Sequence, residues 1–315
     1  MKKNLSIVAA VTSLGLILSG CSSSESTSDA SSAIAVVAAF YPLEFVATAI
    51  GGDLISVENV TPPGVEPHDL ELTPSQVATL DDADLLLYIS GFQPALEEAA
   101  QQSPPAELMD LLSIEGLNLL TATEDGHNHG AVATATEEVA SDKEIASDPH
   151  VWLDPERLVV VAKAVASKFA EVDPDNSEVY ATNLTAFVAQ LESLDQKFLI
   201  GLASCERDLI VTSHAAFSYL ADAYGLSQEA IAGLSPESEP TPKRLNEIGK
   251  EAKADGTTTI FFETLASPKV AQTLADDLNI EAAVLDPLEG VSEGQTYFSI
   301  MESNLEALRK ALNCK

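Results

Sequence analysis

Two of the five histidines in this sequence follow apolar segments that have the composition of β-strands, and a third precedes a predicted helix start. His68 and His214 stand in short loops directly after such segments, and His150 stands in the stretch DPHVWLDP at residues 148–155. The proline at 149 disfavours helix at the residue before it, and Asp154 followed by proline is typical of a helix start. His150 is therefore predicted to lie on extended backbone just before a helix. Taken alone, it has the alternative of being an ordinary half-buried imidazole.

The carboxylate of Asp286 also follows directly on a strand-like segment. In open α/β sheets, ligands bind beyond the carboxyl ends of the strands. We therefore expect His68, His214 and Asp286 at such edges, with His150 entering from its loop. At least 64 residues separate each of these four positions from the next, whereas small structural zinc modules have ligands only a few residues apart. The four residues need a folded scaffold to meet, which favours reversible binding in a cleft between two lobes.

Three neutral imidazoles and one carboxylate suit a borderline divalent cation, and Zn²⁺ in near-tetrahedral geometry fits this set. Mn²⁺ fits less well because it prefers oxygen ligands. A helix is predicted from Ser213 to about Gly225, and its positive N-terminal end would favour a neutral His214 that can bind metal. Nearby carboxylates could orient the ligand imidazoles through hydrogen bonds. The candidates for this role are Asp148, Asp154 and Glu263.

The first residues have the pattern of a secretory signal peptide at 1–20, with two lysines, an apolar segment and small residues before Cys21. The stretch LSGC at 18–21 matches the bacterial lipobox, which predicts that Cys21 is lipidated and becomes the mature N-terminus. Residues 21–33 are rich in Ser and are predicted to be a flexible tether. No later segment is long and apolar enough to span a bilayer. The protein is therefore expected to be exported and lipid-anchored at the outer face of the cytoplasmic membrane.

Composition narrows the possible partners. The chain carries 49 Asp and Glu against 16 Lys and Arg, a formal net charge of −33. Such a surface repels nucleic acid and suits a cation, although acids that only keep the chain soluble would give the same balance. With Cys21 lipidated, Cys205 and Cys314 remain, and an even pair in an exported chain predicts one disulfide.

Strand-like and helix-like segments alternate along the chain, which predicts an α/β fold with mostly parallel sheets flanked by helices. A long segment with helical periodicity at 176–203 is predicted to be one rigid helix of about 40 Å. It separates an N-terminal lobe at 34–175 from a C-terminal lobe at 204–315. Residues 117–120 are expected to form the fourth strand of the first lobe.

An acidic loop at 121–147 interrupts this alternation and contains His127 and His129. A loop of this length inside a compact domain is usually functional or disordered. The His-x-His pair and its acids could collect metal transiently. The two imidazoles lie too close in sequence to replace three from the lobes, and a solvated insertion without a role in binding is the alternative.

Five stretches together resemble the metal-binding lipoproteins of bacterial zinc and manganese ABC importers. They are residues 63–74 (PGVEPHDLELTP), 148–155 (DPHVWLDP), 213–217 (SHAAF), 260–264 (IFFET) and 285–288 (LDPL). The resemblance covers nearly all of the chain after the tether. It implies two α/β lobes, a rigid linking helix, and a monomer that delivers its ion to a membrane permease.

The ligand positions of that family match His68, His150, His214 and Asp286. Zinc members are similar to this chain in having His at the third position, where manganese members commonly have Glu. Zinc members often carry a loop rich in His and acids where this chain has residues 124–144, but only two histidines lie there. The resemblance therefore implies a zinc-binding component, with a manganese-binding one as the alternative.

Two alternatives from other classes are a secreted zinc hydrolase and a metal-stabilised adhesin. Three histidines with an open fourth position would suit a hydrolase, and Glu66 or Glu263 would have to act as its base. The sequence contains no His-Glu-x-x-His motif and no other local catalytic signature. A binding protein rather than an enzyme is therefore predicted, and turnover of an ester or peptide substrate would distinguish the two.

Overall fold

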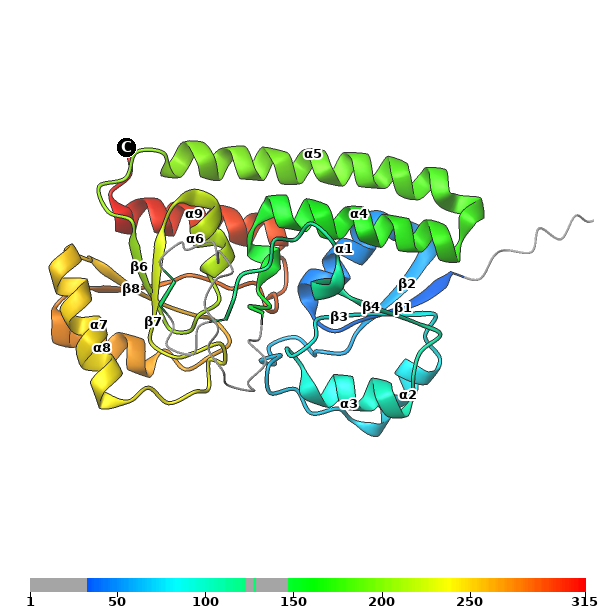
Figure 1. The fold of residues 1–315 in the computed structure, drawn as a ribbon, viewed down its shortest axis with the longest axis horizontal. Helices are drawn as coiled ribbons and strands as arrows, with labels where there is room; N and C mark the ends of the chain where they lie inside the picture. Colours follow the sequence, from blue (N-terminus) through cyan, green and yellow to red (C-terminus); the bar gives the residue numbers. More distant parts are fainter. Residues whose placement is uncertain (1–32, 123–126, 129–146) are drawn as a thin grey trace, which may run out of the picture. The chain divides into compact units, whose positions relative to one another are not determined.

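The computed structural model describes residues 33–122, 127–128 and 147–315. The predicted signal peptide, Cys21, most of the tether and His129 lie outside these ranges. The first of two sheets has the strand order β2-β1-β3-β4, and all of its pairs are parallel (Figure 1). Its strands are β1 (Ile34–Ala38), β2 (Ile55–Asn59), β3 (Leu85–Tyr88) and β4 (Glu107–Asp110). The helices between them are α1 (Tyr41–Gly51), α2 (Pro74–Asp81) and α3 (Pro94–Gln102).

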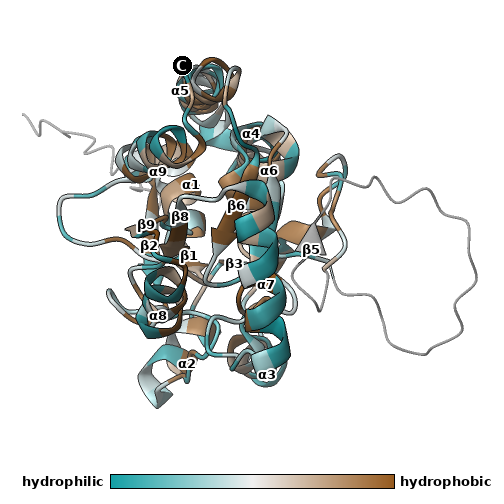
Figure 2. Cartoon of the chain, turned by 90° about the vertical axis from the view of Figure 1, so that its left-hand side faces the viewer, coloured by the Kyte–Doolittle hydropathy of each residue, from teal (hydrophilic) through white to brown (hydrophobic). Residues whose placement is uncertain are grey.

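The second sheet has the order β5-β7-β6-β8-β9, and only β5 runs antiparallel to its neighbour among the described strands. Its strands are β5 (His127–Asn128), β6 (Leu209–Thr212), β7 (Ser227–Ala230), β8 (Thr259–Phe262) and β9 (Glu281–Val284). The helices of this half are α6 (Ser218–Tyr224), α7 (Pro242–Asp255), α8 (Lys269–Leu278) and α9 (Tyr297–Leu312). Apolar strands at the centre lie between helices whose outward faces are hydrophilic (Figure 2).

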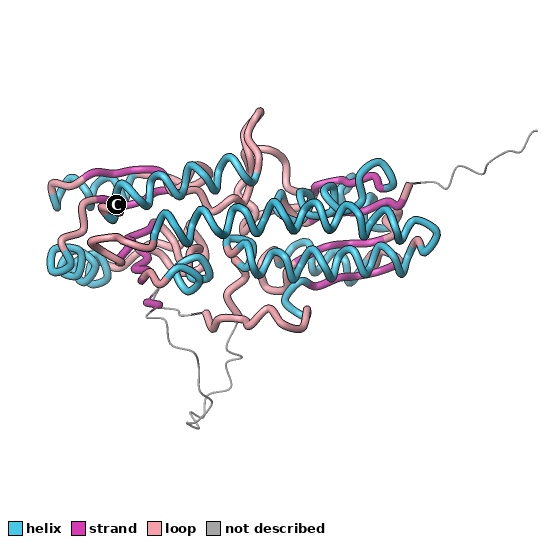
Figure 3. Tube along the Cα trace, turned by 90° about the horizontal axis from the view of Figure 1, so that it is seen from above, coloured by secondary structure: helices cyan, strands magenta, loops and turns pink. Residues whose placement is uncertain are grey.

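Two long helices, α4 (Pro155–Val172) and α5 (Ser177–Leu202), follow one another along the chain before β6. The 26 residues of α5 correspond to about 39 Å at the usual helical rise. Figure 3 shows α5 passing along both groups of strands, with loops gathered between them. Its apolar side packs on both halves, because Phe187 meets Phe45 of α1 at 5.3 Å and Phe198 meets Tyr224 of α6 at 5.0 Å between ring centroids. The predicted fold of two α/β lobes joined by a long helix is confirmed.

The structure corrects the prediction of a strand at 117–120. These residues are irregular because Gly116 has φ +90° and Asn118 has φ +50°, and such left-handed residues interrupt an extended strand. The fourth strand is β4 instead. The sequence also gave no sign of β7, whose residues SQEA lack an apolar run. One part of the acidic loop, β5, pairs with β7 in the second sheet, although the predicted boundaries place the loop in the first lobe.

Four short 3₁₀ helices complete the regular structure of the described residues: Gly52–Leu54, Leu111–Ser113, η3 (Val151–Leu153) and Pro174–Asn176. Cys205 lies just after α5 and Cys314 just after α9, and their sulfurs are bonded at 1.97 Å. The predicted disulfide is therefore present in the structure. Among the residues described, no helix combines the length and apolar character needed to cross a membrane.

Candidate metal centre

Three histidines and one glutamate meet where the loops of the two lobes converge. His68, His150, His214 and Glu289 each offer one ligand atom, and these four atoms all lie within 4.8 Å of one another. The Nε2 atoms of the three imidazoles lie 3.4, 3.5 and 3.3 Å from Glu289 Oε1, in that order. His150, His214 and Glu289 are almost fully buried. The cluster is therefore an enclosed group of three nitrogens and one carboxylate.

The spacing of these atoms fits a single tetrahedral cation better than it fits hydrogen bonding. Among the described residues, none of the three Nε2 atoms and neither oxygen of Glu289 has a hydrogen-bond partner. A buried polar atom without a partner costs about 1–3 kcal/mol, so five in one place need an explanation. Tetrahedral zinc with bonds of about 2.0–2.1 Å places neighbouring ligand atoms about 3.3–3.4 Å apart. The observed separations from Glu289 agree with that geometry.

His68 comes from the proline-rich loop between β2 and α2. The carboxylate of Glu66 accepts hydrogen bonds from the backbone N–H groups of His68 (3.1 Å) and Asp69 (3.2 Å), which fixes the turn. Burial raises the pKa of Glu66 to about 7, and the charge of Glu289 adds to this effect. The ring of Phe92 lies 4.3 Å from the His68 ring and forms an apolar wall. Glu66 therefore shapes the loop that presents His68.

His150 stands directly before η3 with φ −80° and ψ 38°, so the predicted extended backbone at this residue is wrong. Asp148 Oδ1 accepts from both the backbone N–H of His150 (2.9 Å) and its ring Nδ1 (2.8 Å). This contact fixes the ring and leaves Nε2 to face the cluster. The carboxylate–imidazole arrangement is the one that usually orients metal-binding histidines.

Glu263 lies beside His214 as its ion-pair partner, with Oε1 2.6 Å from His214 Nδ1, and the same oxygen accepts from the hydroxyl of Ser213. The predicted helix start at Ser213 is wrong, because α6 begins at Ser218. The backbone carbonyl of His214 instead accepts from Thr212 Oγ1 (2.7 Å) and Gln228 Nε2 (3.1 Å). A polar network at the end of β6, rather than a helix dipole, therefore positions this imidazole.

The predicted ligand Asp286 does not join the cluster. Its Oδ2 accepts from Thr264 Oγ1 (2.9 Å) and its Oδ1 accepts from the backbone N–H of Leu288 (2.8 Å). Leu288 has φ +61°, a left-handed conformation that turns the chain sharply. That turn brings Glu289, three residues later, into the position expected for Asp286. Asp286 therefore stabilises the turn that presents the carboxylate, and Glu289 is the candidate ligand.

Trp152 connects His150 to this turn. Its indole Nε1 donates to the backbone carbonyl of Pro287 (2.7 Å), and its own carbonyl accepts from the hydroxyl of Tyr297 at the start of α9 (2.8 Å). The ring also packs on Phe40 of the first lobe, with 4.8 Å between centroids. One buried side chain therefore sets the distance between two candidate ligands from different lobes.

Arg157 on α4 and Tyr219 on α6 support the segment that carries Asp148 and His150. The sequence pattern did not indicate a role for either residue. The guanidinium of Arg157 binds Asp154 (2.6 Å) and Asp222 of α6 (2.9 Å), and it lies 4.8 Å above the Tyr219 ring. The Tyr219 hydroxyl donates to the backbone carbonyl of Asp148 (2.8 Å). The predicted orienting role of Asp154 is not seen, because this residue caps α4 and binds Arg157 instead.

Replacing Asp148 by asparagine should lower the affinity for zinc by about 10–100-fold, the usual effect of losing a partner that orients a ligand. The amide keeps the shape of the side chain but removes the charge that stabilises and aligns His150. Competition with a chromophoric chelator measures the loss. Asp175→Asn, at an exposed position between α4 and α5, serves as control, and equal affinities for the Asp148 variant and wild type would contradict the role assigned to this carboxylate.

Binding should weaken as the pH falls. Burial opposes a charged His150 and a charged His214, but Asp148 outweighs it for the first, and Glu263 with Glu289 outweigh it for the second, so both pKa values are raised. Burial lowers the pKa of His68. Zinc binds only neutral imidazoles. Because the pKa values of His150 and His214 are raised, protons compete with zinc for their ring nitrogens already at pH values above about 6.5, the ordinary pKa of histidine. Titrations between pH 8 and 6 should show a falling affinity and proton release on binding, and a constant affinity would contradict this account.

Comparisons with known proteins fit the cluster. A family model described as zinc-uptake complex component A, periplasmic (ZnuA), matches residues 36–311. The high-affinity zinc uptake system protein ZnuA of Bacillus subtilis (strain 168) is 34% identical over 309 residues, which cover 95% of this chain and 95% of that protein. The zinc-binding lipoprotein AdcA of Streptococcus pneumoniae is 33% identical over 327 residues, and the match covers 98% of this chain but 61% of AdcA.

Solved structures agree in fold. The crystal structure of Zn(II)-bound AdcA from Streptococcus pneumoniae has a TM-score of 0.72 and 30% identity, covering 90% of this chain and 58% of that one. The laminin-binding protein Lmb of Streptococcus agalactiae, described as bifunctional with adhesin and metal transporting activity, has a TM-score of 0.76 and 29% identity. That match covers 89% of this chain and 99% of Lmb.

Proposed function

This chain belongs to the family of the zinc-uptake complex component A, and from that membership we propose that it binds zinc outside the cytoplasmic membrane and passes it to an ABC permease. The observation that carries the proposal is the enclosed cluster of His68, His150, His214 and Glu289. Zinc is the transported substrate here, and it is held by ligands from both lobes. Lipidation at Cys21 and the Ser-rich tether at 21–33 would keep a monomer near the membrane.

The ligand set favours zinc over manganese. Three imidazole nitrogens form a softer site than an oxygen-rich one, and zinc also lies above manganese in the usual affinity order. The enclosed cluster has little room for the six ligands that hard cations prefer. The relatives are named for zinc uptake and zinc binding, which also favours transport over the hydrolase alternative.

Titration of the metal-free mature protein with zinc and with manganese tests the proposal. We expect one tight zinc site per chain and binding of manganese weaker by more than about tenfold, given the ligand types and the affinity order. Copper should bind at least as tightly as zinc by the same order, so its availability in the cell has to contribute to selectivity. A preference for manganese would contradict the assignment.

A further inference from the structure

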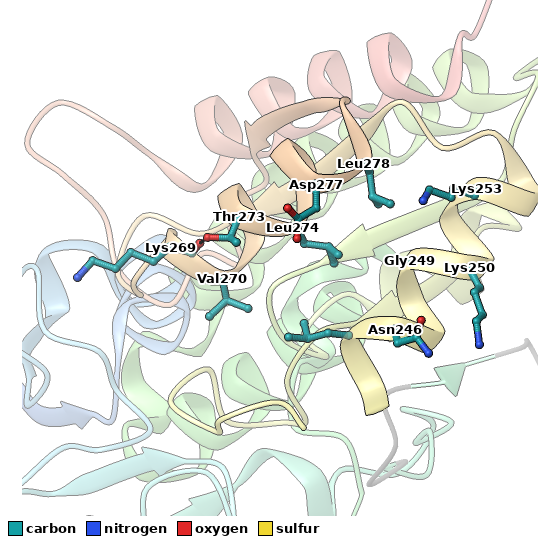
Figure 4. A pocket seen from close by; sticks show the side chains of 11 residues that line it. Asn246, Gly249, Lys250, Lys253, Lys269, Val270, Thr273, Leu274, Asp277 and Leu278 are labelled. Atoms are coloured by element: carbon teal, nitrogen blue, oxygen red, sulfur yellow. Dashed lines mark hydrogen bonds between the residues drawn. The ribbon is translucent and has the colours of Figure 1, made fainter. Parts of the chain in front are cut away.

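A groove of about 490 Å³ lies between α7 and α8, on the outside of the second lobe (Figure 4). Its floor is apolar, with Leu245 of α7 facing Leu274 and Leu278 of α8. Val270 adds an apolar side chain that is 39% exposed. None of the residues that line the groove belongs to the metal cluster. Its role must therefore be distinct from holding the ion.

Three lysines line this groove: Lys250 and Lys253 on α7 and Lys269 at the start of α8. All three are exposed, and none of them forms an ion pair with a carboxylate of the described residues. Asp277 is the one acid among the lining residues. Most other cations of the described chain, such as Lys197 and Lys310, do contact a carboxylate.

This grouping is unusual for the chain. The whole chain has 49 acidic and 16 basic residues, and no Lys or Arg occurs between Lys3 and Lys143. The first lobe therefore has no lysine or arginine to offset its acids before residue 143, whereas three lysines without a described carboxylate partner lie around one apolar groove of the second lobe. Unpaired cations around an apolar floor are complementary to a segment that carries both acidic and apolar side chains.

We propose that the groove between α7 and α8 is the docking site for an acidic segment of the membrane protein that receives the zinc ion. The apolar floor holds one or two aliphatic or aromatic side chains of that segment, and the lysines pair with its carboxylates. This inference rests on the proposed function. In both Figures 1 and 2, α7 and α8 lie with α2 and α3 on the side opposite α5.

A protein segment fits the groove better than the two other possible occupants. A lipid surface is broad and would be met by a convex apolar face, whereas this site is a channel between two helices. A second copy of the chain carries the same formal charge of −33, and two such chains repel each other at long range. The docking contact should also weaken as salt rises, because exposed ion pairs are screened.

Reversing the charge of the three lysines tests the proposal in the full chain. The variant Lys250→Glu/Lys253→Glu/Lys269→Glu replaces the native copy in its own cells, and uptake of radioactive zinc is measured. We expect uptake at limiting zinc to fall by at least about tenfold, because like charges then meet across the interface. The zinc affinity of the purified variant should stay within about twofold of wild type, since surface changes far from a site act nearly independently of it.

The matched control reverses three other cations that pair with no described carboxylate, Lys163, Arg309 and Lys315, and changes the net charge equally. Its uptake should stay near that of wild type. A second pair of variants separates the floor from the lysines. Val270→Asp should impair uptake, whereas Val179→Asp on α5, where the valine is 44% exposed, should not.

Normal uptake by the groove variants, or equal losses in the groove and control variants, would overturn the inference. Lysine-dependent binding to phosphatidylglycerol vesicles would assign the groove to lipid, and lysine-dependent dimers in sedimentation would assign it to a second copy. Either result would also overturn it. A wild-type chain that supports no zinc uptake would overturn the proposed function and this inference together, so the two failures are distinguishable.

Discussion

Replacing His150 by alanine should lower the affinity for zinc by more than about a hundredfold, because partners that only orient a ligand already cost 10–100-fold. The ring is fully buried and is fixed by Asp148 at 2.8 Å. A water molecule in its place would lack both that anchor and the nitrogen ligand. Competition titration with a chelator of known affinity measures the change. Zinc binding as tight as that of wild type would show that His150 is not a ligand.

Glu289, inside the cluster, and Asp286, beside it, allow the effect of losing a ligand to be compared with that of losing a supporting carboxylate. Glu289→Ala should weaken zinc binding directly and give a Co²⁺ complex with an altered visible spectrum, because a ligand oxygen is lost. Asp286→Ala should have a smaller effect than His150→Ala and leave the ligand set unchanged, because Asp286 hydrogen-bonds Leu288 and Thr264. A larger loss for Asp286→Ala than for Glu289→Ala would restore Asp286 as the ligand.

Removing the disulfide with Cys205→Ser/Cys314→Ser should lower the free energy of unfolding by about 4 kcal/mol in the chain-entropy model. The two cysteines are 109 residues apart in sequence, so the bond restricts a long loop of the unfolded chain. Backbone hydrogen bonds beside it, from Lys315 to Ser204 (3.0 Å) and from Glu206 to Leu312 (3.0 Å), remain in the variant. Urea unfolding of the metal-free protein measures the difference.

Zinc affinity serves as the control for this variant, because the cysteines lie beyond α5 and α9 and do not contact the cluster. It should stay close to that of wild type. Reduced wild-type protein should unfold at the same urea concentration as the double variant. An oxidised wild type that is no more stable than the variant would show that the bond contributes little in solution.

The three histidines could be predicted from sequence because each one follows a feature that local chemistry determines. His68 and His214 come after strands, and parallel topology sends the ends of those strands to one edge of each sheet. His150 lies between prolines that restrict its backbone. The long helix was also predictable, since its apolar residues recur at helical spacing. In each case the signal lies within a short segment of the chain.

The fourth ligand was not predictable in the same way. Asp286 is the first acid after β9, but the choice between it and Glu289 depends on the left-handed conformation of Leu288. That conformation is stabilised by contacts with distant residues, including the indole of Trp152. The roles of Arg157 and Tyr219 likewise depend on how α4 and α6 meet. Tertiary contacts of this kind leave no periodic signal in the sequence.

The contacts of Trp152 also give the molecule an optical property. It is the only tryptophan in the chain, its ring lies 5.2 Å from that of His150, and its indole N–H is bonded to the turn that carries Glu289. Fluorescence excited at the indole therefore comes from one place, beside the imidazole whose charge changes when an ion replaces a proton. Capture and release of zinc can be followed in the unlabelled protein, in real time, by the colour and intensity of that emission.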